Sequence, residues 1–257
     1  MSRAVDAVKN YARPPDRKML SKDGHVLPVF LIGEGSSPKC SSGGVLRELP
    51  TYKHKGTPCL VTSGLTALST SNMENYSVHF LRSNSNERKT KEKEWTRLKS
   101  IEVEKGDQGL IIIPAKKSRS LKDHRQFPVK ALTSEERSSA RLVCHIVEGT
   151  YKSFEVYTCE LKYSQDDGNY VLCLGDKYVR TYEELVKRQP KFHPYGSVIL
   201  EKEEKESVTY TAVGVLSFVK DKICPLFFEP PRPAVGRCKL NAVAIWPVTG
   251  QGFQNTK

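Results

Sequence analysis

Residues 154–161 read Phe-Glu-Val-Tyr-Thr-Cys-Glu-Leu, an almost regular alternation of apolar and polar side chains. Because successive side chains of a β-strand point to opposite faces, this pattern predicts a strand with one face in a core and the other in water. Similar short apolar runs lie around it, at 141–147, 170–174, 197–200 and 210–218. Their spacing predicts a group of antiparallel strands in the second half of the chain.

The first half of the chain contains strand-like runs of the same kind. Short apolar or alternating runs, separated by Gly, Ser, Asn and Pro, occur at 26–32, 45–46, 59–61, 76–81 and 95–103. The most apolar β-branched run, 110–114, ends in a proline and predicts a buried strand. Helical patterns are short: Thr133 to Glu136 is typical of a helix N-terminus, and 181–188 predicts one helical turn.

These runs predict an all-β protein with few short helices. A chain of 257 residues is long enough for one large β domain or two smaller ones, and two runs of strands joined by a polar linker favour two small barrels. The expected segments are an irregular N-terminal arm (1–43), a first barrel (44–115), a basic linker (116–140), a second barrel (141–220) and a proline-rich wrap with a last strand (221–257).

Composition restricts the function classes. The formal charge of +12 favours acidic partners such as nucleic acid, an anionic membrane or an acidic protein surface. The seven cysteines are odd in number and lack any C-x-x-C spacing, and no apolar run is long enough to span a membrane. Residues 1–20 are charged and lack the apolar region of a secretory signal. We therefore expect a cytoplasmic or nuclear protein, not a secreted one, with reduced thiols and without a metal or cofactor.

Three stretches resemble parts of the trypsin-like (chymotrypsin-fold) serine proteases. Residues 56–64, followed by Leu-Thr-Ala at 65–67, are similar to the family's early G-x-x-F-L-V strand, which leads into its T-A-A-H segment. Residues 106–113 look like the strand that contributes the family's catalytic acid. Residues 195–200 and 213–218 look like the nucleophile loop and the V-G-I-x-S-W strand that walls the specificity pocket. The resemblance covers about residues 44–220 and implies two antiparallel barrels of the six-stranded type.

The catalytic positions depart from the family's pattern. The resemblance places the acid at Asp107, but the four residues after Thr66-Ala67, which include Ser69, contain no histidine. Tyr195 stands before Gly196 where the nucleophilic serine is expected, and a phenol without a base does not replace that serine. The glycine-rich turn of an oxyanion hole is also missing there. The resemblance therefore implies an inactive member, with Ser69, Asp107, Tyr195 and Gly196 as vestigial-site positions.

Two other interpretations of these residues stay open. If the register shifts by two, Ser197 becomes the nucleophile, with His79 or His54 as the base and Asp107 as the orienting acid. The protein would then be an active serine protease. Alternatively, Ser197 is an ordinary hydroxyl at a strand edge, and Asp107, which lies in the sequence Lys-Gly-Asp-Gln-Gly, is a turn residue.

A basic cluster in the expected linker is the strongest candidate for polyanion binding by charge; it consists of Lys116, Lys117, Arg119, Lys122 and Arg125. It contains no aromatic residue for stacking on bases, and a charge run on a linker is usually solvated. A nucleic-acid-binding β protein is therefore the second alternative. The favoured interpretation is an intracellular protein-interaction or scaffold module that accepts an extended peptide at an exposed strand edge. The oligomeric state does not follow from the sequence.

Overall fold

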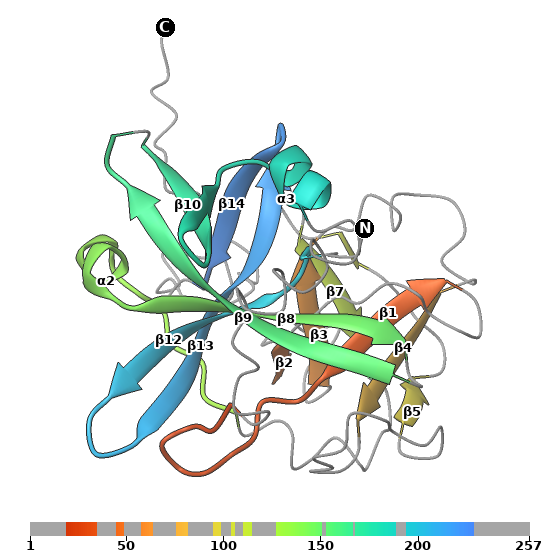
Figure 1. Ribbon diagram of the computed structural model, residues 1–257. Helices are drawn as coiled ribbons and strands as arrows, with labels where there is room; N and C mark the ends of the chain where they lie inside the picture. Colours follow the sequence, from red (N-terminus) through yellow and green to blue (C-terminus); the bar gives the residue numbers. More distant parts are fainter. Residues whose placement is uncertain are drawn as a thin grey trace, which may run out of the picture.

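The computed structural model describes residues 19–34, 45–48, 58–63, 76–81, 95–98, 104–105, 110–114, 127–150, 153–166, 168–188 and 194–228. Within these residues the chain is mainly β-strand with two short helices (Figure 1). This confirms the prediction of a mainly β protein with few short helices. No helix among them is long and apolar enough to cross a membrane.

The second half of the chain forms a seven-stranded antiparallel sheet with the order β11-β10-β9-β8-β12-β13-β14. The run 154–161 lies in β9, where Cys159 and Leu161 are buried, as the alternation predicts. The strands are β8 (Leu142–Thr150), β9 (Ser153–Ser164), β10 (Asn169–Leu174), β11 (Lys177–Val179), β12 (Val198–Glu204), β13 (Val208–Val219) and β14 (Lys222–Phe227).

This sheet curls until its two ends meet. Thr181, just after β11, forms an antiparallel bridge with Lys222 at the start of β14. The rings of Tyr170 on β10 and Phe227 on β14 lie 5.6 Å apart between centroids. The concave side encloses an apolar core that includes Cys144, Leu172, Leu185, Ile199, Val213 and Phe227. Because the ends meet, the edges of β11 and β14 are joined where Thr181 lies.

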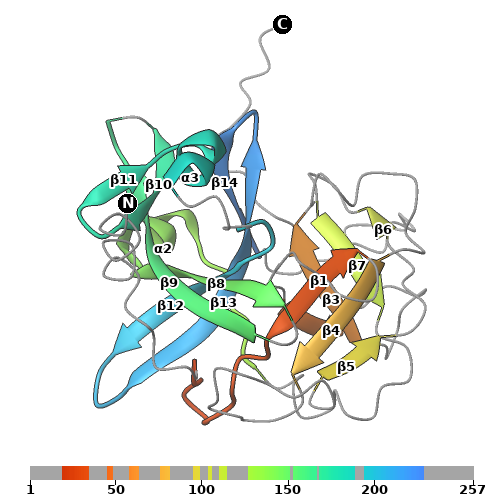
Figure 2. The ribbon, with the colours of Figure 1, turned by 45° about the vertical axis from the view of Figure 1, so that its right-hand side comes forward.

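The first half contributes two smaller antiparallel sheets, which lie beside the curled sheet (Figure 2). One has the order β1-β4-β5 and the other β2-β3-β7-β6. The strands are β1 (Phe30–Glu34), β2 (Val45–Glu48), β3 (Pro58–Ser63), β4 (Tyr76–Leu81), β5 (Trp95–Leu98), β6 (Glu104–Lys105) and β7 (Leu110–Pro114). The predicted strand at 110–114 is therefore present and central, with β3 on one side and β6 on the other.

Apolar side chains from both halves form a shared interface cluster. Its buried members are Met19, Leu27, Cys59, Val61, Phe127, Val143, Val198, Leu200, Ala212, Val215, Leu226 and Phe228. One polar contact also joins the halves, because the buried Ser63 hydroxyl donates a hydrogen bond to the carbonyl of Leu216 at 2.5 Å. The end of β3 therefore lies directly against β13.

Three segments expected to be irregular are packed onto the sheets instead. Within the expected arm, Met19 and Leu27 are buried in the interface cluster, and Tyr210 N–H donates to Leu20 O at 2.9 Å. Within the expected linker, Phe127 is buried and Val129 forms a parallel bridge with Ala212. Leu27 belongs to the apolar run 26–32, whereas Met19 and Phe127 lie outside any longer apolar run, so no periodicity marks their packing in the sequence.

The third segment is the start of the expected proline-rich wrap, where β14 continues the sheet to Phe227. Lys220 and Asp221 have φ angles of 48° and 68°, which is the left-handed pair of a two-residue type I′ hairpin turn. Pro225 is tolerated in β14 because it pairs with Leu216, whose backbone N–H donates to Ser197 on the opposite side.

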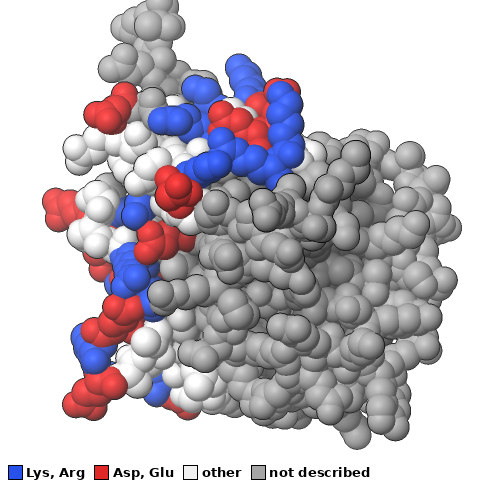
Figure 3. Space-filling model, in the orientation of Figure 1, with Lys and Arg blue, Asp and Glu red and all other residues white. Residues whose placement is uncertain are grey.

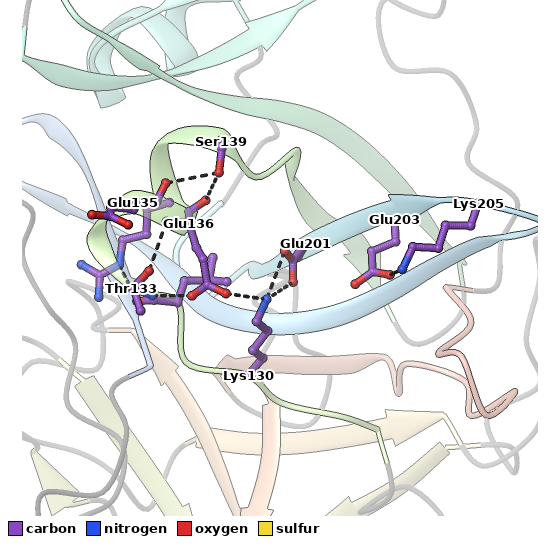
Figure 4. Close-up of polar contacts among 10 residues, drawn as sticks. Lys130, Thr133, Glu135, Glu136, Ser139, Glu201, Glu203 and Lys205 are labelled. Atoms are coloured by element: carbon purple, nitrogen blue, oxygen red, sulfur yellow. Dashed lines mark hydrogen bonds and ion pairs between the residues drawn. The ribbon is translucent and has the colours of Figure 1, made fainter.

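Both predicted helical turns are confirmed. Helix α2 (Ser134–Ser139) starts at a capping box, in which Thr133 Oγ1 accepts from Glu136 N–H at 3.2 Å and Glu136 Oε2 accepts from Thr133 N–H at 2.8 Å (Figure 4). Helix α3 (Tyr182–Arg188) is capped by Thr181, and Asp221 Oδ1 accepts from Glu183 N–H at 3.0 Å. The turn between β13 and β14 therefore also holds the start of α3.

The backbones of β13 and β14 lie very close together at Gly214. A Cβ atom at this position would lie 2.5 Å from the backbone oxygen of Leu226, closer than any real contact. We expect Gly214→Ala to lower the free energy of unfolding by about 1–3 kcal/mol in urea denaturation, because a backbone atom must move. Val208→Ala, at the exposed start of β13, is the control and should change it by less than about 0.5 kcal/mol. Equal effects would contradict the close approach.

Candidate functional site

The candidate site lies where the turn before β12 runs along β13. Tyr195 and Gly196 form this turn, and Gly196 has a φ of 75°, a conformation that glycine adopts without strain. Gly196 N–H donates to Leu216 O at 2.9 Å, and Leu216 N–H donates to Ser197 O at 2.8 Å. The structure therefore brings together the two stretches, 195–200 and 213–218, that the sequence analysis assigned to one site.

Three aromatic rings form a compact aromatic cluster at this turn: Tyr182, Tyr195 and Phe218. The ring centroids lie 5.2 Å apart for Tyr182 and Tyr195, 4.9 Å for Tyr195 and Phe218, and 5.1 Å for Tyr182 and Phe218. Burial, followed by the nearby Tyr182 and Asp221, raises the pKa of Tyr195. The phenol is therefore neutral at pH 7 and serves as an aromatic packing group.

Ser197 is enclosed by the fold. The residue is 1% exposed, and its Oγ has no hydrogen-bond partner among the described residues. The backbone N–H of Ser197 donates to Pro194 O at 3.1 Å. A serine nucleophile needs access to substrate, a nearby base and donors for the oxyanion, among them its own N–H. Here the hydroxyl is covered and that N–H already has a partner.

Several predicted site residues lie outside the described part of the chain. Ser69, Asp107, His54 and the basic cluster from Lys116 to Arg125 are among them. His79 lies in β4, where its backbone pairs with Leu31 and Arg97, and its side chain is outside the described part. Two members of the alternative triad, the His79 side chain and Asp107, therefore lie outside the described part of the chain.

A buried histidine that the sequence analysis did not single out lies close to this site. His145 in β8 is 3% exposed and stands opposite Val198 of β12 and Thr158 of β9. Burial lowers the pKa of His145 to about 4, and a hydrogen bond with its own backbone offsets this only in part. Alternation along β8 places it on the same face as Val143, which lies in the interface cluster. A neutral imidazole therefore lies between the halves.

One backbone edge at the site has no pairing strand among the residues that the structure describes. Because Phe228 N–H donates to Val213 O, the alternating ladder directs residues 213, 215, 217 and 219 of β13 toward β14. Residues 214, 216 and 218 point the other way, as the bonds of Leu216 to Gly196 and Ser197 confirm. Phe218 is the next residue of this set, and its N–H and C=O have no partner among the described residues. They face the side on which Tyr195 lies.

The described residues taken together carry no excess of positive charge, although Lys and Arg side chains gather over helix α3 (Figure 3). Along the edge formed by β12 and β13, basic and acidic side chains interleave (Figure 3). Lys130 pairs with Glu136 at 3.1 Å and with Glu201 at 3.2 Å, which ties the segment before α2 to β12 (Figure 4). Other pairs are Arg141 with Glu160 and Glu204, Lys162 with Glu160, Lys202 with Glu204, and Lys205 with Glu203. The described residues also contain no group of three or more potential metal ligands.

The burial of His145 predicts a specific acid sensitivity. Between pH 6.5 and about 4 the unfolded chain binds a proton at this residue that the folded chain does not, so acidification favours unfolding. The difference amounts to about 3 kcal/mol once the pH falls below the folded-state pKa. We expect His145→Gln to flatten the pH dependence of unfolding free energy in this window. His25→Gln, at a partly buried surface position, is the control and should retain it. Parallel curves for wild type and His145→Gln would contradict this account.

Comparison with known proteins does not assign the chain to a family. No protein-family model matches the sequence, and no curated protein is significantly similar to it. A function must therefore be argued from the geometry around Tyr195, Ser197 and Phe218.

Proposed function

We propose that this protein is a non-catalytic member of the trypsin-like fold that works inside the cell as an interaction module. In this proposal it binds an extended peptide segment of a partner protein by adding it as a strand to the open edge of β13 at Phe218. The proposal that the protein binds a peptide is supported by the backbone edge at Phe218 beside the aromatic cluster. The proposal that it is not a protease is supported by the burial of Ser197.

The strand order supports the proposed fold. In the second half, β8, β9, β10, β12, β13 and β14, numbered one to six in chain order, pair as 3-2-1-4-5-6, and strands three and six touch through Tyr170 and Phe227. In the first half, β7 is numbered six, because β6 is a two-residue strand that pairs with β7. The two sheets of this half then contain the orders 1-4-5 and 2-3-6. Both are fragments of the same cyclic order, as two copies of one barrel would give.

The non-catalytic assignment is supported by the groups around the expected nucleophile. In the register that aligns Tyr195 with the nucleophile, the ring packs on Phe218 and is neutral. In the shifted register, Ser197 is buried and its N–H donates to Pro194. Neither register presents a hydroxyl with a hydrogen-bonded base among the described residues, which is the arrangement that acyl transfer needs.

The binding assignment is supported by the chemistry of the open edge. The N–H and C=O of Phe218 have no partner among the described residues, and an extended peptide added beside Phe218 would satisfy them with main-chain hydrogen bonds. Aromatic side chains next to such an edge provide apolar contact area, and aromatic residues are enriched in the centres of protein interfaces. Backbone pairing accepts any extended segment. The sequence of the partner is therefore selected by those of its side chains that face the aromatic cluster.

The absence of hydrolase activity can be measured directly. We expect a fluorophosphonate probe not to label the full-length protein, because the Ser197 hydroxyl is buried and lacks a base among the described residues. Trypsin under the same conditions is the positive control. Labelling that disappears in Ser197→Ala but persists in Ser217→Ala, a second buried serine, would overturn the non-catalytic assignment.

Strand addition can be tested with a display library of random linear peptides captured on the immobilised full-length protein. We expect peptides to be enriched and to bind Phe218→Pro at least about 5-fold more weakly than Phe218→Ala. Both variants lack the ring, but only proline removes the N–H that faces the open edge. Circular dichroism and urea denaturation confirm that both variants fold. Equal affinities for the two variants would contradict strand addition, and salt-sensitive retention on DNA or RNA without peptide binding would support a nucleic-acid function instead.

A further inference from the structure

We propose that Tyr195 acts as a built-in plug of this site and thereby determines which peptides the site accepts. Its phenol ring occupies the space beside Phe218 that a side chain of the added strand would otherwise enter. This inference rests on the proposed peptide binding at the open edge of β13. It goes beyond it by naming the residue that sets specificity and the class of segment that fits.

The position of the Tyr195 ring is set by its backbone. The residue stands between Pro194 and Gly196, whose φ of 75° turns the chain back onto β13. The hydrogen bonds from Gly196 to Leu216 and from Ser197 to Pro194 hold this turn on both sides of the contact with β13. A swing of the ring away from the site would therefore disturb the turn or break the contacts with both neighbouring rings.

The ring contacts close the space in front of the open edge. Tyr195 lies 4.9 Å from Phe218 and 5.2 Å from Tyr182, and these two rings are themselves in contact at 5.1 Å. Offset and edge-to-face arrangements at these distances are favourable aromatic contacts. All three side chains are partly buried, so no further ring fits between them without displacing one. A large side chain of an added strand would therefore have to displace one of the three rings to lie against Phe218.

Charged groups of both signs lie around the plug, because Lys220 and Lys222 flank Asp221 in the hairpin turn and helix α3 ends in Lys187 and Arg188. Asp221 lies close enough to Tyr195 to raise its pKa, and its carboxylate also caps helix α3 through Glu183 N–H. Lys187 on α3 pairs with Glu183 at 2.6 Å. A segment with a small residue, glycine or alanine, opposite Tyr195 therefore meets no steric conflict with the ring. We assign this class of extended segment as the ligand of the site.

Removal of the plug should create a site for the removed fragment itself. The change Tyr195→Gly deletes a group equivalent to 4-methylphenol and leaves a space lined by Tyr182 and Phe218. Apolar cavities created by deleting a large side chain can bind small aromatic molecules. We expect 4-methylphenol at millimolar concentration to raise the Tm of Tyr195→Gly by at least about 2 °C, because a ligand that binds only the folded state stabilises it. Wild type should show no such rise.

The matched control is Tyr178→Gly, which deletes the same group from an exposed position in β11. An equal rise for this variant, or no rise for Tyr195→Gly, would overturn the plug. If Tyr195→Gly does not fold, the same experiment is done with Tyr195→Ala and phenol. A folded Tyr195→Ala that phenol does not stabilise would also overturn the plug.

The peptide library separates this inference from the proposed function. We expect wild type to enrich segments with glycine or alanine opposite Tyr195, and Tyr195→Gly to enrich aromatic residues there. Enrichment of the same peptides by both proteins would overturn the plug while leaving strand addition intact. Rescue by 4-methylphenol without any peptide enrichment would leave the plug intact and reject the proposed function.

Discussion

The site depends on where the backbone pairing of β13 ends. Along most of its length this strand is bonded on both edges: to β14 on one side and to β12 with the turn at Gly196 on the other. On the second side the ladder formed by the described residues ends at Leu216, one alternation before Phe218. The N–H and C=O of Phe218 therefore lack a partner among these residues, because residues 214, 216 and 218 share one direction. The placement of Tyr195 follows too, since the turn that ends the ladder carries its ring.

Buried polar groups lie where the two halves of the chain meet. Ser63, His145 and Ser197 are all nearly inaccessible, and Ser63 bonds to the carbonyl of Leu216 across the interface. The hydroxyls of Ser197 and Thr158 have no partner among the described residues, which costs stability. A catalytic hydroxyl must instead be accessible and activated. The interface cluster surrounds this region with apolar side chains, and the neutral form of His145 is the one compatible with it.

The net charge of the whole chain differs from the charge balance of the described residues. The whole chain carries +12, yet acidic residues slightly outnumber basic ones among the described residues. On the described surface the cations of the β12–β13 hairpin are paired with carboxylates, which reduces their attraction for a polyanion. The excess of basic residues belongs to other stretches of the sequence, including the basic cluster from Lys116 to Arg125. The proposed peptide site therefore rests on backbone and aromatic groups rather than on charge.

Local patterns in the sequence determined the β class, most strand positions and both helices. The alternation at 154–161 needs only neighbouring residues to predict a strand, and the capping box at Thr133 and Glu136 closes within one turn. The family resemblance marked residues 195–200 and 213–218 as candidate-site stretches, and the structure pairs them through Ser197 and Leu216. Tertiary structure alone decided the rest. The burial of Met19 and Phe127, the enclosure of Ser197, the neutral His145 and the open edge at Phe218 all depend on which distant strands meet. Hydrogen-bond direction and burial are properties of contacts between segments far apart in the chain, and no local pattern of residues specifies them.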